Sequence, residues 1–222
     1  MSIRSMPLRK FLQLMGAAPN LRTAKLREDI RNDLARQRGD ETGGPDFFSP
    51  FWRSAKNHVF GFADLHTSVE EHIDANPARK NLYPRLRDGF LLWWNERRRW
   101  TNQPFTETGL IKGNYTNIQL GVTAKIGNVL CVRDGGAENH FIYPYFSADP
   151  ALSEETARIG LWVLKQAFPA VSSNELRVLD VIRGINYSLE STPLRGDEQA
   201  VFEDRIGRLV GEWDRLRAEY DE

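Results

Sequence analysis

The chain has 222 residues and no formal net charge at pH 7, and its 41% hydrophobic and 27% charged residues are typical of a soluble globular protein. It contains no run of about 18 apolar residues, so we expect no membrane-spanning helix and no membrane partner. The single cysteine, Cys131, excludes an internal disulfide framework and a cysteine-based metal site, and we expect an intracellular, cytoplasmic protein.

The first forty residues predict two helices. A basic segment precedes an apolar one at the N-terminus, as in a signal peptide, but the helical spacing of the apolar residues favours a short amphipathic helix, formed by Leu8, Phe11, Leu12 and Met15. A second helix is predicted from about Thr23 to Arg38. The polar residues 39–46, which include two adjacent glycines and a proline, predict a loop.

Start signals predict three further helices before residue 100. Ser49 followed by Pro50 provides an N-cap with proline at the first helical position. Thr67 with Glu70 has the spacing of a capping box. Pro84 opens a helix that we expect to continue to about residue 100.

The last of these helices has the sequence RLRDGFLLWWNERRRW over residues 85–100. At 100° per residue its large aromatic side chains share one direction and predict a core-facing stripe of Phe90, Trp93, Trp94 and Trp100. Three consecutive arginines then point in three directions, with Arg97 among the tryptophans and with Arg98 and Arg99 near the negative end of the helix dipole. A surface that stacks bases needs exposed aromatic rings beside converging arginines, so the spacing favours a core helix.

From residue 109 the pattern changes to strands. Residues 114–126, 128–132 and 140–146 are rich in β-branched and aromatic residues and predict three antiparallel strands with tight turns. In the third strand, HFIYPYF, apolar residues alternate on both sides, so both faces are expected to be buried. Pro144 lacks an N–H and places this segment at a sheet edge or a strand end.

The remaining residues predict a helix from Ser153 to about Phe168, a strand over 175–182 and a long amphipathic helix from near Asp197. We therefore predict an α+β fold in which a helical N-terminal half packs on a small, mainly antiparallel sheet, with the order αβββαβα from residue 84. Residues 1–108 form the helical region and residues 109–222 the α+β region of one compact unit.

The order αβββαβ is similar to the core of PD-(D/E)XK nucleases. The resemblance implies an acid on the second strand and an acid two residues before a lysine on the third, which together hold a metal ion. The third strand here has neither. The nearest substitutes are Asp134, Glu138 and His140 around the Asp-Gly-Gly turn, where acids and glycines also suit a hairpin and where we expect exposure at the sheet's rim. No metal site and no cofactor motif is predicted.

Charge is distributed unevenly along the chain. Residues 1–112 hold 19 basic and 13 acidic residues, a net charge of +6, and residues 113–222 hold 11 and 17, a net charge of −6. A basic half is typical of proteins that contact nucleic acid or an acidic partner, and the two halves also complement each other for self-association. The residues expected to reach such a partner precede or open the tryptophan-rich helix and are Arg79, Lys80, Arg85 and Arg87.

Two functional hypotheses follow. The first is a non-catalytic intracellular module that binds a macromolecular partner, either protein or nucleic acid, as a subunit of a larger nucleic-acid-handling or defence-related assembly. It rests on the missing catalytic motifs, the charge asymmetry and the many tryptophans and arginines, which are common in interfaces. The arginine bias, 23 against 7 lysines, is that of a GC-rich bacterial genome. The alternative is a divergent PD-(D/E)XK-like nuclease with a degenerate or atypical active site.

Overall fold

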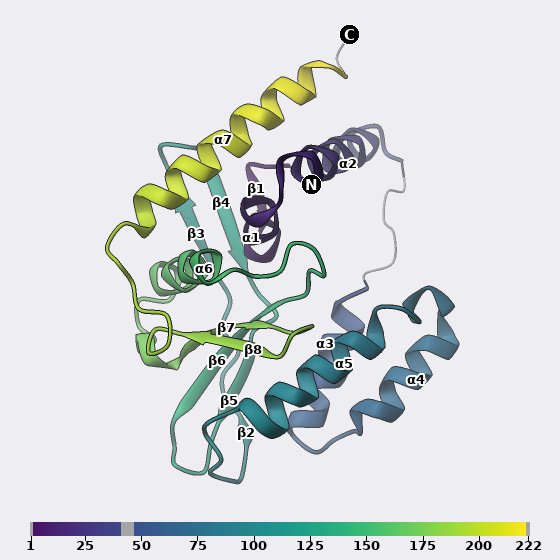
Figure 1. Ribbon diagram of the computed structural model, residues 1–222, viewed down its shortest axis with the longest axis vertical. Coiled ribbons are helices and arrows are strands. Elements are labelled where there is room, and N and C mark those ends of the chain that lie inside the picture. The colour runs from purple at the N-terminus through teal and green to yellow at the C-terminus, as the bar shows by residue number, and fades with distance from the viewer. Residues whose placement is uncertain (1, 41–46, 221–222) are drawn as a thin grey trace.

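The computed structural model describes residues 2–40 and 47–220, and it confirms the predicted α+β class (Figure 1). The predicted loop at 39–46 lies mostly outside these residues. No helix in the described ranges is long and apolar enough to cross a bilayer. The elements are β1 (Ser5–Pro7), α1 (Leu8–Gly16), α2 (Pro19–Gln37), α3 (Ser49–Val59), α4 (Leu65–Ala75), η1 (Pro77–Arg79), α5 (Tyr83–Leu92), η2 (Trp93–Arg97), β2 (Thr106–Glu107), β3 (Gly113–Asn117), β4 (Val122–Ile126), β5 (Leu130–Arg133), β6 (Asn139–Tyr145), α6 (Glu154–Ala167), η3 (Ser173–Glu175), β7 (Leu176–Asp180), β8 (Ile185–Ser188) and α7 (Glu198–Ala218).

The described strands form two mixed sheets rather than the single sheet that we predicted. In the smaller sheet, β1 pairs in parallel with β4, and β3 and β4 form an antiparallel hairpin. The sequence predicted one strand over 114–126, but residues 118–121 form a turn. Gly121 has a φ of 60°, which glycine adopts without a steric penalty, and the side chain of Asn117 accepts the N–H of Leu120 at 2.9 Å. The alternation of apolar and polar residues continues through this turn, so the sequence pattern alone did not indicate it.

The larger sheet has the strand order β2-β5-β6-β7-β8, with β6 antiparallel to β5 and parallel to β7. The strand β6 is therefore central and not at an edge. The other predicted position for Pro144, near the end of a strand, is confirmed. Pro144 is the second-last residue of β6, and the pairing of β6 with β5 stops before it, at Ile142. The missing N–H of proline therefore costs no hydrogen bond between β6 and β5. The short β8 was not predicted, since residues 185–188 show no clear alternation.

Two hydrophobic clusters occupy opposite faces of β6. Figure 1 shows α1, α2, α6 and α7 at one end of the molecule and α3, α4 and α5 at the other. The first cluster includes Phe11, Trp162 and Phe202, and the second includes Phe51, Phe90 and Leu179. Tyr143 contributes to the first and Ile142 to the second, so both faces of β6 are buried as predicted. The helices α1 and α2 thus pack with C-terminal elements, and the boundary near residue 108 stays a prediction.

Helix caps show where local sequence signals succeed. Ser153 caps α6, as predicted, by accepting the N–H of Thr156 at 3.2 Å. The predicted cap at Thr67 is wrong, because the N-cap of α4 is Asp64, three residues earlier, whose carboxylate accepts the N–H of Thr67 at 2.9 Å. Aspartate is as good an N-cap as serine and better than threonine, so it prevails over the capping-box pattern.

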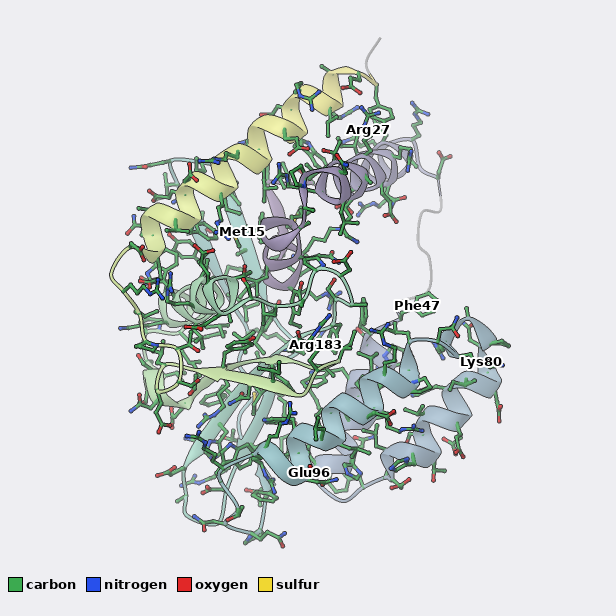
Figure 2. The ribbon with its side chains drawn as sticks, viewed as in Figure 1. Met15, Arg27, Phe47, Lys80, Glu96 and Arg183 are labelled. Carbon is green, nitrogen blue, oxygen red and sulfur yellow. The ribbon has the colours of Figure 1, made fainter. Side chains whose placement is uncertain are left out.

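The helix α5 packs across the turn between β7 and β8, and the backbone of the helix contacts the backbone of the turn. A Cβ atom on Gly89 would lie 2.2 Å from the carbonyl oxygen of Val181, and one on Gly184 would lie 2.5 Å from the carbonyl oxygen of Gly89. The turn itself is held by the buried Asp180, which binds the guanidinium group of Arg183 at 3.0 Å. Figure 2 shows Arg183 where this turn approaches the helices of the second cluster.

We predict that Gly89→Ala lowers the free energy of unfolding by at least about 3 kcal/mol, at the upper end of the usual cost of overpacking, because backbone atoms and not a flexible side chain oppose the new methyl group. Chemical denaturation measures this change. The matched control is Gly211→Ala in α7, where a Cβ meets no atom within 4 Å, and where alanine is expected to stabilise the helix by up to about 1 kcal/mol. Equal stability of parent and Gly89→Ala would contradict the close approach.

Candidate anion-binding pocket

The tryptophan-rich helix ends earlier than the sequence predicted. After Leu92 it continues as one π-helical turn over Trp93–Arg97, which the N–H of Arg98 closes by donating to the carbonyl of Trp93 at 2.8 Å. The backbone at Arg98 is extended, with φ −68° and ψ 128°, so Trp100 is not helical. The directions that we derived for an ideal helix therefore do not apply to the three arginines.

Arg97, Arg98 and Arg99 line one cavity of about 250 Å³ together with Arg177 of β7. The prediction that the three consecutive arginines cannot converge is wrong, because the π turn and the extended exit redirect them. We call this cavity the arginine pocket. Its complete lining is Trp93, Arg97, Arg98, Arg99, Trp100, Arg177, Gly184, Ile185, Asn186, Ser188, Glu190 and Ser191.

Arg98 lies among aromatic rings, a position that the sequence predicted for Arg97. Its guanidinium carbon is 3.7 Å from the ring centre of Trp94, 4.2 Å from that of Phe105 and 4.8 Å from that of Trp100. Burial lowers the pKa of Arg98 to about 10, so the group stays protonated at neutral pH. Its Nε and Nη1 atoms are buried and have no hydrogen-bond partner among the described residues. The rings supply cation–π attraction but no acceptor.

The other pocket arginines have different partners. Arg97 is exposed and donates to the carbonyl oxygens of Arg183 at 3.0 Å and Gly184 at 3.2 Å. Arg177 donates to the carbonyl oxygen of Glu175 at 3.0 Å, and burial lowers its pKa against the opposing effect of nearby carboxylates. Arg99 is 84% exposed and lies 3.9 Å from the carboxylate of Glu190, the one acid of the pocket lining. Four guanidinium groups thus share a small concave surface.

Trp100 also packs against the β5–β6 hairpin. Its ring stacks on His140 at 3.9 Å between centres, with 9° between the planes. The sequence predicted an exposed hairpin, but Asp134 is 5% exposed and His140 is 2% exposed, while Glu138 is exposed as expected. The segment that follows Trp100 also covers the turn, because the N–H of Gly135 donates to the carbonyl of Asn102 at 2.8 Å.

Asp134 and His140 form a buried hydrogen-bonded pair, with Nε2 of His140 3.2 Å from Oδ2 of Asp134. Burial opposes ionisation of Asp134, but hydrogen bonds from His140 and from the N–H groups of Glu138 and Gly136 outweigh it and lower the pKa of the carboxyl group. Burial lowers the pKa of His140 against the effect of Asp134, which favours the neutral imidazole at neutral pH. Its Nδ1 atom is buried without a partner in the described part of the chain.

Asp134, Glu138 and His140 each offer one possible metal-ligand atom, and these atoms lie within 4.8 Å of one another. The spacing meets the first geometric requirement of a metal centre. Both oxygens of Asp134, however, already accept hydrogen bonds that shape the hairpin. The structure therefore brings the predicted alternative site together and at the same time gives its central carboxylate a structural role.

The four basic residues predicted to contact a partner differ in their surroundings. Arg79 is half-buried and donates to the carbonyl of His72, and Arg87 forms an ion pair with Asp88 at 2.8 Å. Lys80 and Arg85 are exposed. Figure 2 places Lys80 and Glu96 towards opposite ends of α5, so Lys80 is far from the arginine pocket. A partner contact by these four residues stays a prediction.

Sequence reasoning missed Arg177 and Asn186 as members of the pocket. The available signal was a single arginine inside the apolar strand ELRVLDVI, which needs a polar environment on one side of the sheet. The carbonyl oxygen of the Asn186 side chain is buried without a partner among the described residues. Two residues of the pocket lining, Arg98 and Asn186, therefore carry buried polar atoms that have no partner in the described part of the chain.

Comparison of the chain with models of protein families, with curated protein sequences and with solved structures finds no match.

We predict that the free energy of unfolding falls as the pH drops through 6.5, the ordinary pKa of histidine. The pKa of His140 is lower in the folded chain than in the unfolded chain, so acid protonates the unfolded state first and stabilises it. His140→Gln should reduce this dependence, and not abolish it, because burial also lowers the pKa of His72. Denaturation over a pH series measures the slope.

The control for this series is His66→Gln, since His66 is exposed on α4. It should keep the parental slope between neutral and mildly acidic pH. A parental slope in His140→Gln would show that the buried Asp134–His140 pair does not contribute to the acid sensitivity of the fold.

Proposed function

We propose that this chain is a non-catalytic module that binds nucleic acid through the arginine pocket, as a subunit of a nucleic-acid-handling assembly. The observation that carries the proposal is the convergence of Arg97, Arg98, Arg99 and Arg177 on one cavity with a single acid in its lining. Guanidinium groups bind phosphate oxygens through paired, charge-assisted hydrogen bonds. A concave group of four favours a ligand with concentrated negative charge.

The aromatic residues of the pocket support phosphate binding and not base stacking. Trp93 is 1% exposed and belongs to the second hydrophobic cluster. Trp100 is already stacked on His140 and contacts Arg98. The burial of Trp93 and the contacts of Trp100 compete with base stacking, which agrees with the sequence argument against a stacking platform. Trp100, together with Trp94 and Phe105, instead holds the guanidinium group of Arg98 in place.

Nucleic acid suits the pocket better than an acidic protein segment does because a strand extends beyond the cavity. The first 112 residues carry a net charge of +6, and the exposed Lys80 and Arg85 offer further contacts along the α5 region. A polyanion that contacts several such cations releases condensed counterions, which provides a large part of its affinity. An acidic protein is the competing class and is an outcome of the test.

We predict that labelled single-stranded and duplex nucleic acids bind to the protein and that affinity falls steeply with salt. Fluorescence anisotropy over a salt series gives the slope of log affinity against log salt concentration. Arg99→Ala should weaken the binding of all sequences alike and reduce the slope by about one, because the variant loses one phosphate contact.

The matched control is Arg208→Ala on α7. Arg208 is 77% exposed and 3.0 Å from Asp204, so it resembles Arg99 in exposure and in having an acidic neighbour, but it lies outside the pocket. This variant should bind like the parent. If the parent binds no strand at the lowest salt concentration, nucleic acid is not the ligand, and an acidic protein becomes the preferred partner class.

A second candidate function is the divergent nuclease. The convergence of Asp134, Glu138 and His140 within 4.8 Å favours it, as does their separation from the arginine pocket by the single ring of Trp100. A nuclease would use carboxylates to hold a metal ion and arginines to hold the phosphate. Against it, Asp134 has both oxygens engaged within the hairpin, and magnesium requires near-octahedral oxygen ligands at about 2.0–2.1 Å.

We therefore predict no cleavage of plasmid DNA, single-stranded DNA or RNA with magnesium or manganese, as measured by gel electrophoresis. Metal-dependent cleavage that persists through purification and is abolished in Glu138→Gln would establish the second candidate instead. Glu138 is the suitable probe because its side chain is exposed, whereas Asp134→Asn also removes acceptors that the buried hairpin uses.

A further inference from the structure

We propose that the arginine pocket recognises a phosphorylated end of a nucleic acid strand, with a terminal phosphate bound by Arg98 and its neighbours. This inference rests on the proposed function and specifies the part of the ligand that the pocket takes. The alternative is an internal phosphodiester of a continuous strand. Three properties of the pocket favour the end: its donors, its acceptor and its charge.

The donors are oriented before any ligand binds. The guanidinium group of Arg98 is in contact with the rings of Trp94, Phe105 and Trp100, so its plane is fixed. Its Nε and Nη1 atoms are buried and have no acceptor among the described residues, although buried donors in proteins are nearly always paired. A terminal phosphate offers three free oxygens to the four guanidinium groups of the pocket, whereas an internal phosphodiester offers two.

The acceptor indicates what lies next to the phosphate. Asn186 is one of the residues that line the same pocket, and its Oδ1 atom is buried without a donor among the described residues. The neighbouring hydroxyl groups do not compensate for this, because Ser188 and Ser191 contact each other, with their Oγ atoms 3.3 Å apart. Inorganic phosphate presents few donors at neutral pH. A sugar hydroxyl or a base amino group beside a terminal phosphate provides one.

The charge and size of the pocket favour a compact dianion. Four arginines face one acid in a cavity of about 250 Å³, which is below the usual range for sites that enclose drug-sized ligands. A phosphate monoester carries a charge of about −1.5 to −2 at pH 7, whereas an internal phosphodiester carries a single charge. The end of a strand enters such a cavity from one side, and a continuous strand would have to enter and leave it.

The test compares short strands of one sequence that differ only at their ends. They carry a 5′-phosphate, a 3′-phosphate or hydroxyl groups at both ends, and a fourth strand is circular. Anisotropy should show about tenfold tighter binding for one of the phosphorylated ends than for the hydroxyl and circular strands, the effect of an added charge-assisted hydrogen bond. Inorganic phosphate should compete with the preferred strand on the parent protein more strongly than with the circular strand.

Arg98→Lys should bind all four strands with similar, weaker affinity, because it keeps the charge but loses the planar fork. Arg208→Lys is the matched control and should keep the preference of the parent. Equal parental affinity for all four strands would overturn the inference and leave the proposed function standing. An end preference that persists in folded Arg98→Lys would overturn the assignment to Arg98. Failure of the parent to bind any strand would overturn both proposals.

Discussion

The backbone contact between α5 and the β7–β8 turn determines where the arginine pocket forms. Only hydrogen atoms separate Gly89 from the turn, so the helix lies close enough for Arg97 to donate to the carbonyls of residues 183 and 184. Beneath the turn, the buried Asp180 binds Arg183 and accepts the N–H of Leu152 at 3.3 Å. A shift of the helix by the diameter of one side chain would separate Arg97, Arg98 and Arg99 from Arg177 and open the cavity.

The aromatic rings extend this constraint to the β5–β6 hairpin. A continuous series of contacts runs from the end of η2 to the larger sheet. The guanidinium group of Arg98 contacts the rings of Phe105 and Trp100, Trp100 stacks on His140, and His140 is hydrogen-bonded to Asp134. Such a series has two consequences. It holds a cation in a partly dehydrated position by cation–π attraction, and it covers a carboxylate that the hairpin needs. The candidate metal ligands and the pocket are therefore parts of one packed structure.

The sequence predicted the elements more successfully than their junctions. Apolar periodicity identified α6 and α7, and Ser153 marked the start of α6, because these signals act within one turn of helix. Prediction from the sequence failed where contacts between residues far apart in the chain determine the conformation. Arg97, at the end of η2, donates to carbonyl oxygens 86 and 87 residues away along the chain. The angular argument at 100° per residue placed Trp93 and Trp94 in the core correctly, but Trp100 is only partly buried beyond the helix, and the directions assigned to the arginines were wrong.

The partners of the pocket arginines argue for a ligand more strongly than their number does. On α7, exposed arginines pair with carboxylates one turn away, as Arg208 does with Asp204 at 3.0 Å and Arg215 with Glu219 at 3.2 Å. In the pocket, Arg97 and Arg177 donate to carbonyl oxygens and Arg98 contacts rings. Arg99 lies 3.9 Å from Glu190, a longer separation than in either pair on α7. Carbonyls and rings stabilise a cation without cancelling its charge, so Arg97, Arg98 and Arg177 keep more of their charge for an anion than the paired arginines of α7 do.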